Sequence, residues 1–265
     1  MRSTDTHDDV VLEQYDSRAN AYLTSAVHAA GADLDAMAAL AASHAQAYPG
    51  AVALDMGCGG GHVTFRLAPL VHKIVACDLS AAMLETVAGE AARRGLTNVV
   101  TKRTAAEALP CPDASFDVVA TRFSAHHWGG FAEGLAQMRR AAKPGALALF
   151  ADVVSPGRES PNQRLLDTWL QSIELLRDPS HVRNATVDEW RAALAAAGFA
   201  VDTVTTYRLR IEFASWIERM RTPDVHVAAI RSLQARADRA VRDYFEIEDD
   251  GSFTFDTVLI AAHAA

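Results

Sequence analysis

Residues 53–62 read ALDMGCGGGH, and this stretch decides the fold class of the chain. The apolar run from Ala51 to Asp55 predicts a buried strand, and the segment from His62 to Leu70 predicts a helix. Between them, four glycines in residues 57–61 predict a tight loop whose backbone can approach a ligand closely. The helix that follows offers unpaired N–H groups and positive potential. An ordinary strand-to-helix turn does not need this many glycines, so the stretch indicates a binding loop.

Strand and helix patterns alternate after this loop. Strands are expected at residues 73–77, 98–102, 116–121 and 146–152, and helices at 80–94 and 131–142. This alternation predicts an α/β fold with a Rossmann-like, doubly wound and mainly parallel sheet that helices cover on both faces. Ligands of such sheets lie beyond the carboxyl ends of the strands. Asp55, Asp78, the stretch 104–107 and the stretch 121–128 should therefore line one edge.

Helices are also expected at both ends of this alternation. Helical apolar spacing from about Val10 to Ala30, then a helix with Asp33 as its N-cap, predicts an N-terminal helical lid over residues 1–45. Residues 46–265 should form the Rossmann-like domain, with helices at 165–176 and 187–197 and strands at 200–207 and 254–261 completing a seven-stranded sheet. The segment between these last two strands is too long for a hairpin loop. It predicts a helical cap over about residues 210–248, with Pro223 at the first position of a helix.

The composition narrows the class of protein. The chain has 265 residues, half of them hydrophobic, and a formal net charge of −8. An acidic chain lacks the basic face that phosphate binding requires, which disfavours nucleic acid as a partner. No apolar run approaches the roughly 18 residues of a membrane span, and the polar N-terminus does not resemble a signal peptide. Cys58, Cys77 and Cys111 have neither disulfide nor zinc spacing. We therefore expect a cytoplasmic protein without a metal or a membrane span, either a monomer or a homodimer.

A second motif follows the next expected strand. Asp78 ends this strand about 20 residues after the glycine loop, where a carboxylate can accept hydrogen bonds from both hydroxyls of a ribose. Taken alone, Asp78 could also be a helix N-cap or a solvated turn acid. Dinucleotide-binding sites carry a third glycine where His62 stands, and the chain has no Tyr-x-x-x-Lys pair. A nicotinamide-dependent oxidoreductase is therefore disfavoured.

Together these motifs resemble class I S-adenosylmethionine-dependent methyltransferases. Three further stretches agree: TAAEALP (104–110) resembles the loop beside the adenine, DASFDVV (113–119) the fourth strand, and KPGA (143–146) the turn before the fifth. Within this class the chain resembles the methyltransferases of ubiquinone and menaquinone biosynthesis. RFSAHHW (122–128) and DPSHVR (178–183) resemble a bacterial branch of largely unassigned substrate. Cys58-Gly59-Gly60 departs from the usual pattern, in which the third residue is more often Ala or Thr.

The resemblance implies S-adenosylmethionine as cofactor, S-adenosylhomocysteine as product, and a set of residues that binds them. They are Tyr22, Asp55, Gly57, Cys58, Gly59, Gly61, Asp78, Leu79, Met83, Ala106, Glu107 and Arg122. The glycines would line the methionine part, Asp55 would hold its amino group near the backbone of Arg122, and Asp78 would take the ribose. Leu79 and Met83 would pack near the adenine, which would meet the backbone of residues 106–107. Tyr22 or Tyr15 could close over the cofactor, or could pack only within the core or the lid.

Three histidines are candidate catalytic residues: His126, His127 and His181. Methyl transfer from a sulfonium needs a base only if the acceptor must lose a proton, and imidazole titrates in the right range. His126 and His127 follow the fourth strand, where either could act as base or instead orient structure or substrate. His181 stands close to Arg183, which could recognise an anionic group or form a salt bridge.

The remaining charged candidates are weaker. His28 is better explained as a surface residue of the N-terminal helix. The arginines of the cap, Arg219 among them, are expected mainly on a solvated face, with substrate steering as the alternative. The expected function is therefore S-adenosylmethionine-dependent transfer of a methyl group to an O, N or C atom of a small molecule in a capped active site. The alternative is a protein that binds the cofactor for regulation, or converts it without methyl transfer.

Overall fold

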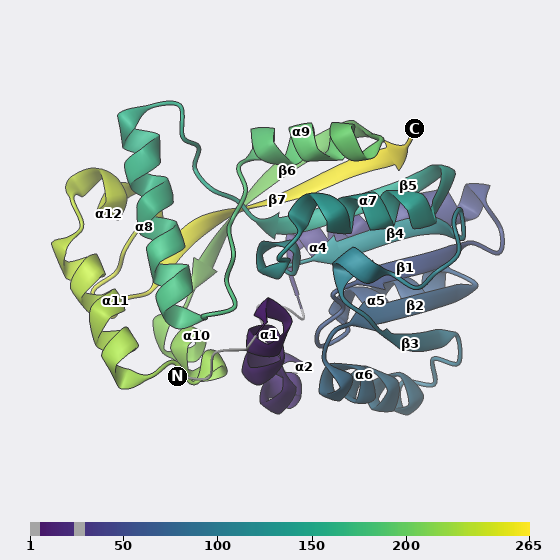
Figure 1. The fold of residues 1–265 in the computed structure, drawn as a ribbon, viewed down its shortest axis with the longest axis horizontal. Helices are drawn as coiled ribbons and strands as arrows, with labels where there is room; N and C mark the ends of the chain where they lie inside the picture. Colours follow the sequence, from purple (N-terminus) through teal and green to yellow (C-terminus); the bar gives the residue numbers. More distant parts are fainter. Residues whose placement is uncertain (1–5, 24–29) are drawn as a thin grey trace.

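The computed structural model describes residues 6–23 and 30–265, and a seven-stranded sheet forms the centre of this part of the chain (Figure 1). The strands are β1 (Val52–Met56), β2 (Lys73–Asp78), β3 (Val99–Arg103), β4 (Phe116–Arg122), β5 (Ala142–Val153), β6 (Phe199–Ile211) and β7 (Phe253–Ala264). They lie in the order β3-β2-β1-β4-β5-β7-β6. Strands β1 to β5 pair in parallel, whereas β7 runs antiparallel to β5 and β6. The Rossmann-like, mainly parallel sheet expected from the sequence is confirmed.

Helices cover both faces of this sheet. They are α4 (Ala32–Ala47), α5 (His62–Leu67), α6 (Ala81–Arg93), α7 (Phe131–Ala141), α8 (Pro161–Arg177) and α9 (Val187–Ala197). Within β4, Val118 packs with α4 and α5 on one face, and Val119 packs with α7 and α9 on the other. Side chains of a strand alternate between faces, so burial on both faces explains the unbroken apolar runs of the central strands.

The strand order reverses at β1, which lies between β2 and β4. After β1 the chain continues into α5 on one face, and after β4 it continues into α7 on the other. This divergence opens a crevice at the carboxyl ends of the two strands, where sheets of this kind bind their ligands. The edge expected to carry Asp55, Asp78 and residues 121–128 is this crevice.

Two groups of helices lie outside the part of the chain in which strands and helices alternate. Near the N-terminus, α1 (His7–Tyr15) and α2 (Ala19–Leu23) lie beside the carboxyl edge, whereas α4 packs on the sheet itself. The segment between β6 and β7 forms α10 (Phe213–Met220), α11 (Asp224–Arg236) and α12 (Arg239–Phe245), which pack with α8 around buried aromatic side chains (Figure 1). The predicted helical insertion before the last strand is therefore confirmed. Across the two described ranges, no helix is both long and apolar enough to cross a membrane.

Three local predictions were wrong. Gly31, not Asp33, is the N-cap of α4, and Asp33 lies in the first turn with its carboxylate paired to Arg122. Pro223 caps α11 from outside the helix instead of occupying its first position. The KPGA stretch lies inside β5 rather than before it, because the strand starts at Ala142 and bulges where its pairing with β4 shifts. For Asp33 and for the KPGA stretch, a contact with a distant part of the chain overrides the local signal.

Candidate functional site

The glycine loop joins β1 to α5 at the carboxyl edge, and its shape requires glycine. Gly57 and Gly59 have φ angles of +67° and +48°, in the left-handed region. A Cβ on Gly57 would lie 1.8 Å from Ser124 Oγ, whereas nothing lies within 4 Å of a Cβ on Gly59. Gly57 thus lets the loop pack against the segment after β4, and Gly59 leaves open space beside the backbone. A Cβ on Gly61 would instead meet the buried Phe65 ring at 2.8 Å.

Asp78 stands at the end of β2 and holds the glycine loop in place. Its Oδ2 accepts a hydrogen bond from the backbone of Gly59 at 2.8 Å, and its Oδ1 accepts one from the backbone of Ser80 at 2.9 Å. Burial raises the pKa of Asp78, although these backbone donors oppose the shift. Ser80, not Asp78, is the N-cap of α6. Each carboxylate oxygen has a second lone pair, so Asp78 can accept further hydrogen bonds from a ligand.

Asp55 and Arg122 lie behind the loop, at the ends of the neighbouring strands β1 and β4. Asp55 is buried and accepts a hydrogen bond from Thr64 Oγ1 at 2.6 Å, and burial raises the pKa of Asp55 to about 7. Arg122 is also buried, and its Nε lies 2.5 Å from Asp33 Oδ2. This pair joins α4 to β4 and fixes the guanidinium at the floor of the crevice.

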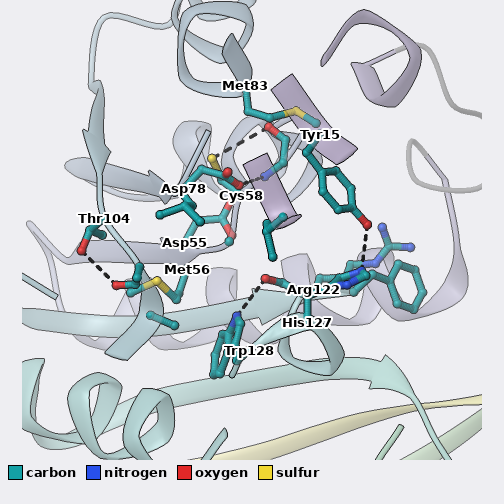
Figure 2. A pocket seen from close by; sticks show the side chains of 18 of the residues that line it. Tyr15, Asp55, Met56, Cys58, Asp78, Met83, Thr104, Arg122, His127 and Trp128 are labelled. Carbon is teal, nitrogen blue, oxygen red and sulfur yellow. Dashed lines mark hydrogen bonds between the residues drawn. The ribbon is translucent and has the colours of Figure 1, made fainter. Parts of the chain in front are cut away.

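These residues line a cavity of about 1000 Å³ that is partly open to solvent (Figure 2). All the predicted cofactor residues except Gly61 are in its lining: Tyr22, Asp55, Gly57, Cys58, Gly59, Asp78, Leu79, Met83, Ala106, Glu107 and Arg122. Figure 2 shows Asp55, Cys58 and Asp78 on one wall and Tyr15 and His127 on another.

A second cavity of about 500 Å³ adjoins the first one. The two cavities share Tyr15, Tyr22, Phe123 and His127. The other residues of the second cavity come from the ends of β5 to β7 and from three further elements: His126, Val153, Glu174, Arg177, Leu209, Ile211, Trp216, Arg219 and Phe255. The two cavities are therefore neighbours that these four side chains border in common.

His126 lines the second cavity and is held by Asp152 of β5. Its Nδ1 lies 2.5 Å from Asp152 Oδ1, and its backbone N–H donates to Asp152 Oδ2 at 3.2 Å. Within the described part of the chain, no hydrogen bond reaches Nε2 of His126. Burial by itself would lower the pKa of His126, but the charge and hydrogen bond of Asp152 outweigh it and raise this pKa. Nδ1 is thus fixed by Asp152, and Nε2 remains available as a hydrogen-bond acceptor.

His127 has neighbours at both of its ring nitrogens. Nε2 lies 2.8 Å from the Tyr15 hydroxyl, and Nδ1 lies 3.2 Å from the carbonyl oxygen of Ser180. The Tyr15 hydroxyl also donates to Asp178 Oδ2 at 2.9 Å. Burial and the neighbouring charge of His126 lower the pKa of His127 to about 4. A neutral ring has one N–H, so with the Tyr15 hydrogen given to Asp178, Nε2–H donates to the Tyr15 oxygen and Nδ1 only packs against the segment after α8.

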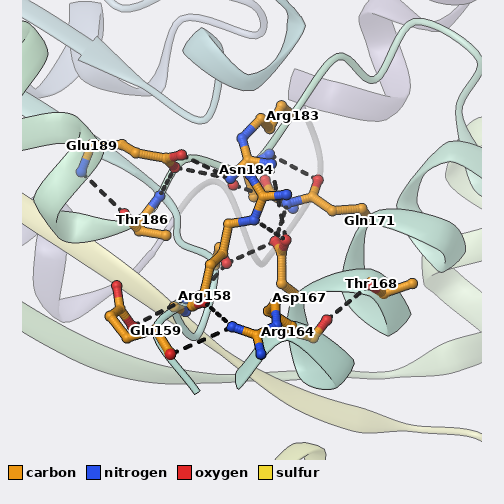
Figure 3. Close-up of polar contacts among 12 residues, drawn as sticks. Arg158, Glu159, Arg164, Asp167, Thr168, Gln171, Arg183, Asn184, Thr186 and Glu189 are labelled. Atoms are coloured by element: carbon orange, nitrogen blue, oxygen red, sulfur yellow. Dashed lines mark hydrogen bonds and ion pairs between the residues drawn. The ribbon is translucent and has the colours of Figure 1, made fainter. Parts of the chain in front are cut away.

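His181 and Arg183 lie away from the shared border of the cavities. His181 Nε2 bonds Gln171 Oε1 at 2.8 Å, and burial lowers the pKa of His181 to about 2. Arg183 bonds Glu189 at 2.9 Å and reaches Asp167 at 3.9 Å, within the polar network that Figure 3 shows beside α8. Neither side chain lines the first or the second cavity. His28 lies outside the described residues.

The N-terminal helices close one side of both cavities. Tyr22 donates a hydrogen bond to Met220 Sδ at 3.2 Å, and the guanidinium of Arg18 donates to the Met220 carbonyl oxygen at 2.8 Å. Ser80 donates to Asp16 Oδ1 at 2.5 Å. These contacts bind residues 15–22 to α10 on one side and to the start of α6 on the other.

Sequence reasoning missed several residues of the site. Asp33 and Asp152 orient Arg122 and His126, and Glu174 and Arg177 line the second cavity. Asp152 is the last residue of an expected strand and therefore lies at the carboxyl edge of the sheet. This position alone could have identified it as a residue of the site. Glu174 and Arg177 carry no such signal, because an acid and a base in a long helix usually face solvent. In the described ranges, no cluster of three or more His, Cys, Asp or Glu could hold a metal ion.

Known proteins resemble this chain in both sequence and fold. A family model described as a methyltransferase domain matches residues 53–145. Uncharacterized protein YafE of Escherichia coli is 44% identical over 209 residues, 79% of this chain and 99% of that protein. Uncharacterized methyltransferase YcgJ of Bacillus subtilis is 33% identical, over 87% of this chain and 88% of that protein. The crystal structure of YcgJ superposes with a TM-score of 0.78, covering 86% of this chain and 98% of that chain.

The name of a more distant relative states the reaction of that relative. The ubiquinone/menaquinone biosynthesis C-methyltransferase of Shewanella frigidimarina is 32% identical over 119 residues, 43% of this chain and 47% of that enzyme. The match is therefore confined to about half of either protein. Since YcgJ matches over most of its length and the fold agrees, the chain belongs to the class I S-adenosylmethionine-dependent methyltransferases and is an enzyme of this family.

Proposed function

We propose that this enzyme transfers the methyl group of S-adenosylmethionine, held in the first cavity, to a small molecule held in the second. The observation that carries this proposal is the shared border of Tyr15, Tyr22, Phe123 and His127. The first cavity contains nearly all the motif residues of the family, and the second is lined by residues that no cofactor motif explains. Two adjoining spaces of this kind suit a two-substrate transfer.

The residues of the first cavity fit the cofactor. Gly59 leaves space where any side chain would intrude, and Asp78 directs a buried carboxylate with free lone pairs at the same space. Asp55 and Arg122 place one acidic and one basic group on the floor, which suits an amino acid moiety. When bound, S-adenosylmethionine supplies a methyl group on a positively charged sulfur that retains the bonding electron pair as the methyl leaves.

His126 is the residue that we propose as general base. Asp152 fixes Nδ1, which leaves the lone pair of Nε2 to accept a proton, and His126 is among the residues that line the second cavity. An acceptor hydroxyl or amine in that cavity can pass its proton to Nε2 as its O or N atom bonds the methyl carbon. The buried Asp152 carboxylate stabilises the imidazolium that forms. His127, whose Nε2–H donates to Tyr15, positions Tyr15 at the border instead.

The helices around the second cavity serve to exclude water. Trp216 and Arg219 of α10 border it on one side, and Tyr15 and Tyr22 of the N-terminal segment border it on the other. We propose that residues 6–23 and the insertion between β6 and β7 together form the cap of the active site. A dry site favours displacement, because water would otherwise solvate the nucleophile and compete with the acceptor.

Calorimetric titration tests the cofactor assignment directly. The purified protein should bind S-adenosylmethionine and S-adenosylhomocysteine with micromolar affinity and should not bind NAD. Incubation with methyl-labelled cofactor and fractionated metabolite pools should then move the label to a small molecule. Binding of NAD alone would overturn the proposal. Cofactor binding with a label that never leaves the cofactor would favour the regulatory alternative.

Asp78→Ala should weaken the binding of S-adenosylhomocysteine by about 10- to 100-fold, the usual range for losing hydrogen bonds to a charged group. The loss has two sources, because Asp78 both offers acceptors to the ribose and holds Gly59. Asp113→Ala is the matched control, since Asp113 forms an exposed ion pair with Arg140. Calorimetry on both variants measures the difference. Unchanged affinity in Asp78→Ala would remove the ribose assignment.

The turnover number should fall as the pH drops through the raised pKa of His126, because only the neutral ring accepts a proton. In Asp152→Asn the charge and the charge-assisted hydrogen bond of Asp152 are lost, so the pKa of His126 should fall, although the charges of Glu174 and Asp178 still raise it. The acidic limb of the pH profile should therefore move to lower pH in this variant. Initial rates with a labelled methyl group across the pH range measure it. An acidic limb at the same pH in both proteins would exclude His126 as the titrating base.

A further inference from the structure

The walls of the second cavity are mostly apolar. Phe123, Val153, Leu209, Ile211, Trp216 and Phe255 all contribute to them. Val153, Ile211, Trp216 and Phe255 belong to the buried cluster between α8, α10 and the ends of the sheet, and Phe123 and Leu209 pack against it. Such walls favour an acceptor with an apolar, preferably flat body, because that body gains both area burial and ring contacts.

Arg177 places a cation in this apolar setting. It ends α8 and is buried, its Nε donates to the carbonyl oxygen of Trp216 at 3.0 Å, and its guanidinium lies 4.9 Å from the centre of the Trp216 ring. In the described ranges, no hydrogen bond or ion pair reaches the two terminal nitrogens of Arg177. A buried guanidinium is costly unless its donors are satisfied, so these nitrogens are suited to a ligand anion.

Glu174 lies one helical turn before Arg177 and lines the same cavity. Its side chain is 5% exposed, and its Oε1 is buried with no hydrogen-bond partner in the described part of the chain. Burial raises the pKa of Glu174, and the charge of Arg177 opposes this shift. A buried carboxyl oxygen without a partner is rare in native proteins, and here it indicates a polar hydrogen supplied by a ligand.

The charges of the wall select the sign of the ligand. Arg177 and Arg219 are both in the lining, against one carboxylate, Glu174. The nearby carboxylates are already engaged: Asp152 with His126, and Asp178 with Tyr15 and Ser180. Within the described residues, the terminal nitrogens of Arg177 thus remain as donors for a ligand anion, which favours a negatively charged group beside them. A cationic acceptor would meet both guanidiniums.

We propose that the methyl acceptor is an apolar monocarboxylate with a hydroxyl or amine as its reacting group, whose carboxylate binds Arg177, while a polar hydrogen other than the one that His126 accepts binds Glu174. This inference rests on the proposed function, since it assigns the second cavity to the acceptor. The planar fork of Arg177 matches a carboxylate through two parallel hydrogen bonds. The apolar body would lie along Trp216 and Phe255, with the reacting group toward His126.

The test compares three compounds with the same scaffold that differ only in the charge of one terminal group: negative, neutral or positive. The full-length protein is first saturated with S-adenosylhomocysteine and then titrated with 3-(4-hydroxyphenyl)propanoate, its primary amide and the matching propylamine, together with a panel of other aryl and alkyl carboxylates and their amides. The best carboxylate of the panel should bind about 10- to 100-fold more tightly than its amide, as expected for a charge-assisted hydrogen-bond pair. The amine should bind most weakly.

Three variants test whether Arg177 and Glu174 of the second cavity cause this preference for the carboxylate. Arg177→Gln should remove the preference for the carboxylate, and Arg239→Gln, which changes an exposed cap arginine, should keep it. Glu174→Gln should tighten carboxylate binding several-fold, because it removes the opposing charge. This opposite change cannot arise from partial unfolding, and unchanged affinity for S-adenosylhomocysteine shows in each variant that the first cavity is intact.

The outcomes separate this inference from the proposed function. If S-adenosylhomocysteine itself does not bind, the proposed function fails. If it binds but amides bind as well as carboxylates, if no carboxylate of the panel binds, or if Arg177→Gln keeps the preference, the monocarboxylate proposal is wrong while the cofactor site stands.

Discussion

Replacing His126 with asparagine should reduce the turnover number by about 10²- to 10⁴-fold, the usual contribution of a positioned general base. Asp152 holds Nδ1 of His126, which leaves Nε2 as the ring nitrogen that can accept a proton in a residue lining the second cavity. The affinity for S-adenosylhomocysteine should not change, because His126 does not line the first cavity. Single-turnover transfer of a labelled methyl group, with calorimetry on the same samples, measures both quantities.

Two other histidine variants make this result specific. His263→Asn alters an exposed ring paired with Asp202 and should keep full turnover. His127→Asn should act differently, because it breaks the contact between Tyr15 and the segment around Ser180. We expect it to speed proteolysis within residues 6–23 and to raise the KM for the acceptor more than it lowers the turnover number. Full turnover in His126→Asn would show that the acceptor needs no base.

Asp33→Ala should lower the free energy of unfolding by about 3 kcal/mol, near the low end of what losing one partner of a buried ion pair costs. Asp33 and Arg122 are both buried, and Nε lies 2.5 Å from Oδ2. Without this carboxylate the guanidinium stays in the interior with less compensation for its lost hydration. Denaturant unfolding monitored by circular dichroism measures the change.

Asp35→Ala is the matched control for this stability effect. Asp35 lies in the same first turn of α4, but its ion pair with Arg66 is exposed, so the free energy of unfolding should change by less than about 1 kcal/mol. Asp33→Ala should also weaken cofactor binding, because Arg122 lines the first cavity and Asp33 orients it. Equal stability of the two variants would show that the buried pair contributes little.

Local sequence signals were sufficient for the architecture. Strand and helix patterns repeat over short distances, and glycine is favoured where the backbone of the loop turns at φ of +48° to +83°. The loop after β1 and the position of Asp78 after β2 were therefore visible in the sequence. The carboxyl ends of parallel strands meet at one edge, so the sequence also indicated which residues would gather around the first cavity.

Only the tertiary structure decided the second cavity and the roles of the histidines. His126 and His127 are adjacent in the sequence, yet one faces Asp152 and the cavity, and the other lies between Tyr15 and Ser180. Thr222 donates a hydrogen bond to the carbonyl oxygen of Arg177, 45 residues before it in the sequence. Asp33 is 89 residues from its partner Arg122. Whether a charged side chain faces solvent or a cavity depends on what packs against it from distant parts of the chain. Helical periodicity cannot show this, because it gives the face of a helix and not the partner of that face.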